Sequence, residues 1–236
     1  MVLLHKKIIG RGFQKNMNNV LPQSSLLLGI IPALLILYIG LKGYEGYYKE
    51  KNIFLTFIAG IITGFVAALI EISTLKVGIS FIVLFPVLEQ LFKTILLNIR
   101  KLQEKRETVI YGLSLGLGFG SIFTPFSIMT TNLQIGDSLY LLISIVFGSF
   151  GIILFHGATG TLLGYGIYKA RMPRYLILTV LLHIPITGLS FLAILYKIEY
   201  VQIGFVAYGI ILFLYVSKKI MPRILSNRRR GKKRNV

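Results

Sequence analysis

Seven long apolar stretches, separated by short polar connectors, constrain this chain more than any other feature of its sequence. They run over about residues 22–41, 53–75, 77–99, 108–129, 139–168, 175–196 and 200–217. Each is close to the ~20 residues that an α-helix needs to cross ~30 Å of hydrocarbon. Backbone polar groups in lipid must pair within their own segment, and the stretches are too long for barrel strands. We therefore predict an all-α, polytopic transmembrane helix bundle of about seven to eight spans.

The composition agrees with a membrane bundle and limits the metal chemistry open to it. Hydrophobic residues make up 55% of the 236 residues and charged residues only 14%, which is more apolar surface than a soluble domain of this length can cover. The chain contains no cysteine. Disulfides and thiolate metal sites are therefore excluded, and any metal ion would need histidine and carboxylate ligands.

The formal net charge of +18 is concentrated in short connectors and in a basic tail. Lysine and arginine beside membrane spans are the ordinary signature of cytoplasmic loops, so we attribute the charge to topology and to contact with membrane lipids, and expect no nucleic-acid partner. We predict three regions: a basic interfacial arm at residues 1–21, a transmembrane helical domain at 22–217, and a basic cytoplasmic tail at 218–236. A cytoplasmic C-terminus and an odd number of spans place the N-terminus outside, although the basic arm counts against that orientation.

Four ionisable side chains stand inside the apolar stretches: Glu89, Lys93, His156 and His183. A charge at the bilayer centre costs about 2.5–3.5 kcal/mol on insertion scales, so such residues persist with partners or with a function. Glu89 and Lys93 are one helical turn apart, in the order that favours an ion pair. Two interpretations stay open: a pair that fixes helix packing, or a base or metal ligand whose ionisation Lys93 adjusts.

His156 and His183 lie in consecutive apolar stretches and extend this pattern. Neutral imidazole and carboxylate are ligands that zinc accepts, and three protein ligands leave a position for water. Zinc lowers the pKa of such a water to about 7, which would provide a nucleophile inside the bilayer. The alternative is that each histidine is a hydrogen-bonded packing residue. We expect Glu71, near the end of its stretch, to be interfacial, with Lys76 available to neutralise it.

Tight helix packing is predicted where small residues recur every four positions. Gly112, Gly116 and Gly120 follow this spacing in one stretch, and Gly160 and Gly164 follow it in another. Such spacing is typical of membrane helices whose backbones approach closely.

Three segments, taken together in their order and spacing, resemble the PrsW family of intramembrane metalloproteases, which is related to the CAAX-protease and bacteriocin-processing group. They are residues 86–93, 109–119 and 156–171, and the similarity runs over about residues 28–220. The resemblance implies a multi-pass protein of a prokaryotic cell membrane. It also implies an enzyme that cuts a transmembrane or juxtamembrane peptide bond with a zinc-activated water.

The motifs of that family can be matched residue by residue. Its Glu-Glu-x-x-Lys motif reads Glu-Gln-x-x-Lys here, its Phe-x-x-x-Glu-Asn motif has Phe123 at the glutamate position, and its two later histidines are present. The position four residues after the second histidine, usually Asp or Asn, is Thr187. The resemblance implies catalytic residues Glu89 and Lys93, zinc ligands His156 and His183, and supporting residues Gln90 and Thr187.

These departures leave three functions open. A divergent protease would use Glu89 to activate water and the two histidines to hold zinc. A catalytically inactive pseudoprotease would keep the bundle and bind transmembrane protein or peptide partners, because a phenylalanine cannot ligate a metal and an amide cannot carry a proton. A small proton-coupled transporter would use the same groups as a relay, but the sequence shows no internal repeat of the kind that transporters contain.

Overall fold

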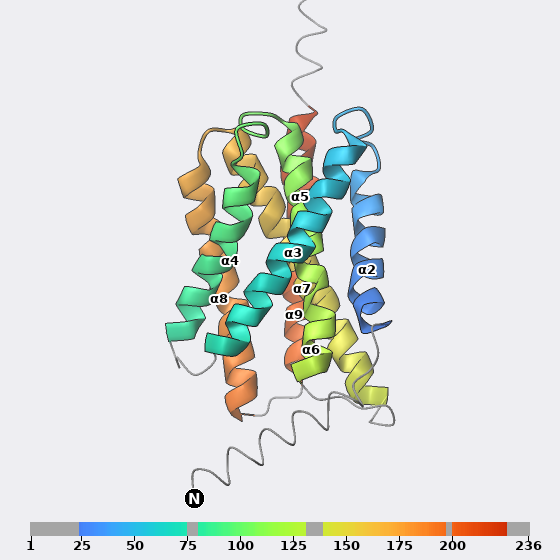
Figure 1. The fold of residues 1–236 in the computed structure, drawn as a ribbon, viewed down its shortest axis with the longest axis vertical. Helices are drawn as coiled ribbons and strands as arrows, with labels where there is room; N and C mark the ends of the chain where they lie inside the picture. The colour runs from blue at the N-terminus through green and yellow to red at the C-terminus, as the bar shows by residue number, and fades with distance from the viewer. Residues whose placement is uncertain (1–23, 75–79, 131–138, 197–199, 226–236) are drawn as a thin grey trace, which may run out of the picture.

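A computed structural model describes residues 24–74, 80–130, 139–196 and 200–225. Within these ranges every regular element is a helix, and the helices stand side by side in one elongated bundle (Figure 1). The bounds are α2 Ser24–Leu41, α3 Glu50–Thr74, α4 Phe81–Leu97, α5 Glu107–Ser121, α6 Phe123–Thr130, α7 Leu139–Tyr168, α8 Met172–Tyr196 and α9 Val201–Tyr215. The prediction of an all-α bundle is confirmed for the described residues.

Within the described ranges, five helical segments are long and apolar enough to cross a membrane. They are Glu50–Glu71, Glu107–Ile128, Leu142–Tyr168, Met172–Ala193 and Val201–Ile224. The second of these joins α5 and α6 into one span. The helices α2 and α4 are shorter, with 18 and 17 residues, and α4 carries three polar side chains at its centre. The structure thus supports a membrane protein, and the count of seven to eight spans stays a prediction.

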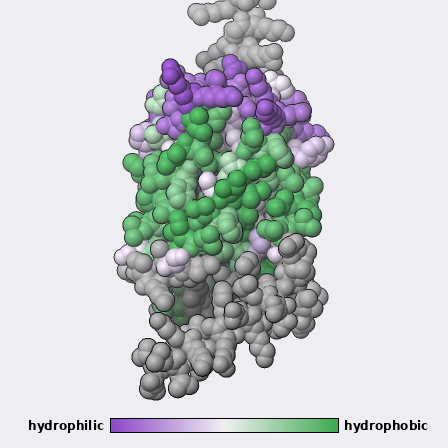
Figure 2. Space-filling view, in the orientation of Figure 1, coloured by the Kyte–Doolittle hydropathy of each residue, from purple (hydrophilic) through white to green (hydrophobic). Residues whose placement is uncertain are grey.

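Hydrophilic side chains gather at one end of the bundle, and apolar side chains cover the visible face below it (Figure 2). The connectors at that end are 42–49, 98–106 and 169–171, together with the turns after α9. Among the described residues, every lysine and arginine other than Lys93 lies in or beside these connectors. Large apolar side chains, such as Phe54, Ile95 and Ile211, are more than half exposed on the outer faces. A surface of this kind suits hydrocarbon, because an apolar patch of such extent in water would promote aggregation.

Helix α5 forms the centre of the bundle. Every residue from Thr108 to Ser121 is buried, and the helix is surrounded by α2, α3 and α7. Its glycines let the neighbouring backbones approach. A Cβ atom at Gly112 would overlap the carbonyl oxygen of Gly160 on α7, and one at Gly118 would overlap the carbonyl oxygen of Phe57 on α3. The predicted close packing of these glycine-rich stretches is therefore confirmed.

The glycines of α5 also determine where one functional side chain lies. A Cβ atom at Gly116 would overlap the carbonyl oxygen of His156, and one at Gly120 would come within 3.2 Å of the His156 Cβ. Helix α7 can therefore place His156 deep in the bundle only because α5 has no side chain at these two positions.

The chain after α9 continues to pack beyond the predicted boundary at residue 217. A π-helical turn, Val216–Ile220, is followed by a 3₁₀ turn, Met221–Ile224. Four apolar residues of these turns are buried: Val216, Ile220, Met221 and Ile224. The first part of the predicted tail thus belongs to the helical domain. The predicted arm at residues 1–21 and the rest of the tail, 226–236, lie outside the described residues.

The contact between α5 and α7 gives a first prediction. We expect Gly116→Ala to destabilise the protein by about 1–3 kcal/mol, because the added methyl group meets backbone that cannot yield. In detergent this should lower Tm by roughly 2–4 °C per kcal/mol. Gly188→Ala is the matched control, since its Cβ would meet only Ile82 Cγ2, at 3.8 Å. Equal Tm values for the two variants would contradict the assigned packing.

Candidate metal centre

The middle parts of α4, α7 and α8 bring three donor groups together. Glu89 Oε2 lies 3.4 Å from His183 Nε2 and 3.8 Å from His156 Nε2. The three side chains are 0%, 2% and 1% exposed, respectively. They come from three helices, of which only α7 and α8 are consecutive in the chain, so the cluster is a product of the fold. The structure thus confirms that Glu89, His156 and His183 form one buried group that could hold a metal ion.

The spacing of these atoms suits a metal ion of the size of zinc. Zinc bonds to nitrogen and oxygen of about 2.0–2.1 Å, arranged as a tetrahedron, keep neighbouring ligand atoms about 3.3–3.4 Å apart. The two separations from Glu89 Oε2, 3.4 and 3.8 Å, are close to this value, and the three donor atoms all lie within 4.8 Å of one another. Neither carboxylate oxygen of Glu89 has a hydrogen-bond partner, although the residue is fully buried. Leaving a buried carboxylate without a partner is costly, and a cation held between it and the imidazoles would remove that cost.

The other ring nitrogens of the two histidines are held by neighbours on α4. Gln90 Nε2 lies 3.0 Å from His183 Nδ1, and Lys93 Nζ lies 3.1 Å from His156 Nδ1. The amide nitrogen of Gln90 and the ammonium of Lys93 are donors, so each contact makes Nδ1 the acceptor and fixes the orientation of the ring. Gln90, predicted as a supporting residue, is thus beside His183.

Lys93 does not pair with Glu89 as the helical spacing predicted. In this part of the described chain no direct ion pair joins the two residues. The Lys93 ammonium instead contacts His156 and Thr159 Oγ1, the latter at 3.2 Å, and it lies 4.9 Å from the centre of the Phe119 ring. The tertiary partners on α7 displace the local partner one turn away, so the ion-pair interpretation was wrong. Lys93 positions His156.

Phenylalanine rings enclose both imidazoles. The ring of Phe123 stacks on His156, with 5.0 Å between the ring centres and an interplanar angle of 21°. The ring centre of Phe119 lies 4.9 Å from that of the same imidazole. The ring centre of Phe155 lies 5.3 Å from that of His156 and 4.9 Å from that of His183. Phe123, which stands where the resembled family has a glutamate, is thus beside the candidate metal ligands.

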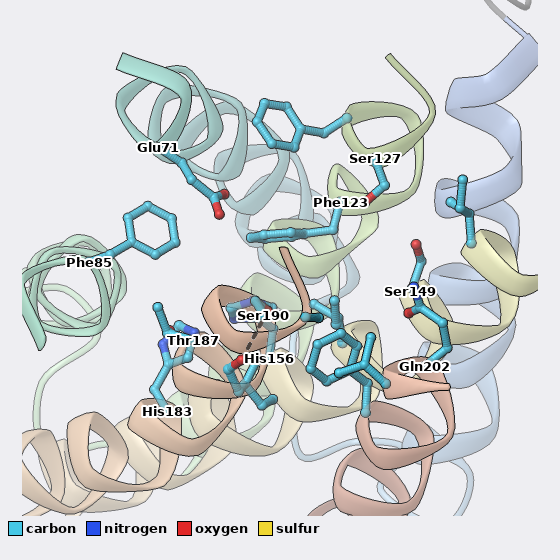
Figure 3. A pocket seen from close by; sticks show the side chains of 17 residues that line it. Glu71, Phe85, Phe123, Ser127, Ser149, His156, His183, Thr187, Ser190 and Gln202 are labelled. Atoms are coloured by element: carbon cyan, nitrogen blue, oxygen red, sulfur yellow. Dashed lines mark hydrogen bonds between the residues drawn. The ribbon is translucent and has the colours of Figure 1, made fainter. Parts of the chain in front are cut away.

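A cavity of about 240 Å³ lies against the two histidines (Figure 3). Thr187, one turn after His183, lines it, as expected for a supporting residue. Four further polar side chains contribute to the wall, and sequence reasoning found none of them: Ser127, Ser149, Ser190 and Gln202. No motif distinguishes these residues from ordinary polar residues near the ends of spans.

Glu71 was predicted to be interfacial and neutralised by Lys76, which lies outside the described residues. In the structure Glu71 is the last residue of its apolar segment, Glu50–Glu71. The structure places Glu71 in the wall of the cavity, with one carboxylate oxygen buried. Figure 1 shows why: α3 crosses the bundle obliquely, and its C-terminal end comes beside α4. A usable signal was present, because Gly60, Gly64, Ala67 and Glu71 share one face of α3 by helical spacing.

Comparisons of the chain with protein-family models, with curated proteins and with solved structures found no match. The family resemblance of the motifs therefore stays a prediction. The functional argument rests on the geometry of the site.

Metal content tests the site directly. After incubation with zinc and desalting, we expect the purified protein to retain about one zinc ion per chain, because three protein ligands are enough to hold zinc. Glu89→Gln should weaken binding strongly, because the amide keeps the shape of the side chain and removes the charge. Glu50→Gln, an exposed change at the start of α3, is the matched control. Zinc retained equally by the Glu89 variant and the wild type, measured by atomic emission, would contradict the site.

Proposed function

We propose that this protein is a PrsW-like intramembrane metallopeptidase that hydrolyses peptide bonds of transmembrane or juxtamembrane segments. One observation carries the proposal. The Oε2 of Glu89 and the Nε2 atoms of His156 and His183 converge in a dry, buried site, where the carboxylate has no hydrogen-bond partner. A cavity adjoins the two histidines. Ligands for a metal ion beside a space for a substrate are the two requirements of metal-assisted hydrolysis.

Each residue of the site has a role in this proposal. Glu89, His156 and His183 would hold the ion, and the donor set of one carboxylate and two imidazoles favours zinc. When bound, zinc supplies a Lewis acid and lowers the pKa of water. Gln90 orients the ring of His183, and Lys93 orients the ring of His156.

The polar wall of the cavity suits an extended peptide. Inside a membrane, the backbone N–H and C=O groups of an unwound segment have no water to bind, and each unsatisfied group costs several kcal/mol. Ser127, Thr187 and Ser190 line the cavity, and their hydroxyl groups can bind such groups. The same side chains would hold a scissile peptide bond near the metal ligands.

The arrangement in a membrane follows from the charged end of the bundle. Counting α2 and α4 with the five longer segments gives seven crossings, in which α5 and α6 form one. The end that carries the basic connectors would face the cytoplasm, and the chain after α9 lies at that end (Figure 1). Ser127 and Gln202 lie close to helix ends on the opposite side, so the cavity would extend from the metal ligands toward the outer leaflet.

A second candidate is a catalytically inactive relative that binds transmembrane segments. Two contacts favour it. Phe123 packs its ring on His156 where the resembled family has a carboxylate. Lys93, as an ammonium, can only donate a hydrogen bond. If it donates to His156 Nδ1, the imidazole hydrogen lies on Nε2, the atom that a metal ion would need.

Cleavage of membrane peptides distinguishes the two candidates. We expect the zinc-loaded protein in liposomes to cut at least one member of a panel of single-span peptides, with products identified by mass spectrometry. His156→Ala and His183→Ala should each reduce cleavage to background, because two ligands hold zinc weakly. Gly188→Ala serves as the control with an unchanged site. Product formation that persists in both histidine variants, or that no chelator suppresses, would contradict a metallopeptidase.

The inactive alternative makes its own prediction about Phe123. We expect Phe123→Glu to tighten zinc binding by about tenfold or more, since a carboxylate would replace an aromatic ring beside His156 and supply another oxygen ligand. Phe123→Leu removes the ring without adding a ligand and is the matched control. Zinc affinity, measured by competition with a chromophoric chelator, should rise only in the glutamate variant. A rise in both would mean that the ring merely obstructs the site.

A further inference from the structure

The proposed metal site has no obvious group to accept a proton. Peptide hydrolysis needs a base that takes a proton from the attacking water and later gives it to the leaving amine. Glu89 and the two histidines are committed as ligands, and Glu89 does not line the cavity. The two positions where the resembled family carries further carboxylates hold Gln90 and Phe123, which cannot accept a proton under these conditions.

The cavity wall contains a carboxylate from a different helix. Among the described residues that line the cavity, Glu71 of α3 is the one acidic side chain. Figure 3 shows its carboxylate directed into the space bounded by Phe85, Phe123 and His156. The end of α3 is thus placed so that this group faces the histidines across the cavity.

Glu71 lies beyond the distance of a ligand. The donor atoms of Glu89, His156 and His183 lie within 4.8 Å of one another, and no oxygen of Glu71 belongs to that group. The gap leaves room for a water molecule or a peptide carbonyl between Glu71 and the histidines. A base needs such a separation, because it must contact the reacting water and not the ion.

We propose that Glu71 is the general base of the peptidase, an inference that rests on the proposed function. Its carboxylate takes one proton from a water molecule in the cavity while the water oxygen bonds to the carbonyl carbon of the peptide. The protonated Glu71 then delivers that proton to the amide nitrogen as the C–N bond breaks. The products are a carboxylic acid and an amine, Glu71 returns to its carboxylate form, and no oxidant or reductant is needed.

The test separates binding of the metal from transfer of the proton. Wild type, Glu71→Gln and the control Glu50→Gln on the same helix are compared for three quantities: zinc per chain, cleavage of the peptide identified above, and affinity for acetohydroxamate. The last is measured on the cobalt(II)-loaded protein from its visible spectrum. A hydroxamic acid binds a metal ion as its anion, so a neighbouring base that accepts its proton strengthens binding without any turnover.

We expect Glu71→Gln to retain zinc at the wild-type level and to lose cleavage by about 100-fold or more, the contribution of a positioned base. Its affinity for acetohydroxamate should fall by about tenfold or more, the worth of one hydrogen bond to a charged group. The Glu50→Gln control should match the wild type in all three measurements.

The remaining outcomes overturn the inference in distinguishable ways. Full cleavage and full hydroxamate affinity in Glu71→Gln would show that another group is the base, with the proposed function intact. Loss of zinc in that variant would show that Glu71 is a ligand. A wild-type protein that retains no zinc or cobalt and cuts no peptide would overturn the proposed function, and the role of Glu71 with it.

Discussion

The backbone contact between α5 and α7 supports everything else in this structure. Gly112 and Gly116 let the two helices touch at their main chains, and a single side chain at either position would push them apart. Membrane helices gain little from burying apolar surface against each other, because lipid is equally apolar, so close packing has to supply the association energy. His156 lies at this contact. The position of His156, one of the three candidate metal ligands, is thus fixed by residues that have no side chain.

The site buries ionisable groups whose removal from water is energetically costly. Glu89, Lys93, His156 and His183 are almost completely buried, and low local polarity strengthens each contact among them while it raises the cost of any group left without a partner. The Lys93 ammonium and the Gln90 amide nitrogen contact the imidazoles. Both carboxylate oxygens of Glu89 and the amide oxygen of Gln90 have no hydrogen-bond partner. The network is therefore incomplete at these two neighbouring residues of α4.

The sequence alone identified the residues of this site whose burial in an apolar environment is energetically costly. Glu89, His156 and His183 stand out because ionisable residues are rare in apolar stretches, whereas Phe123 and Thr187 were singled out only by motif spacing. The partner of Lys93 could not be predicted, since a tertiary contact on α7 competes with the local one. The place of Glu71 in the cavity wall was not predicted, because it depends on the oblique course of α3, which sequence alone does not give. Its helical register with Gly60 and Gly64 was the available clue.

The size of the cavity has a consequence for what the site accepts. An intact helix with its side chains is about 10–12 Å wide, and the cavity, at about 240 Å³, is small beside it. Under the proposed function, a membrane segment would enter most readily where its own helix is locally unstable. Glycine and proline weaken helices most, so selectivity would depend on how readily a segment unwinds and less on the identity of the residues at the scissile bond. The cavity would thus select membrane segments by the local stability of their helix.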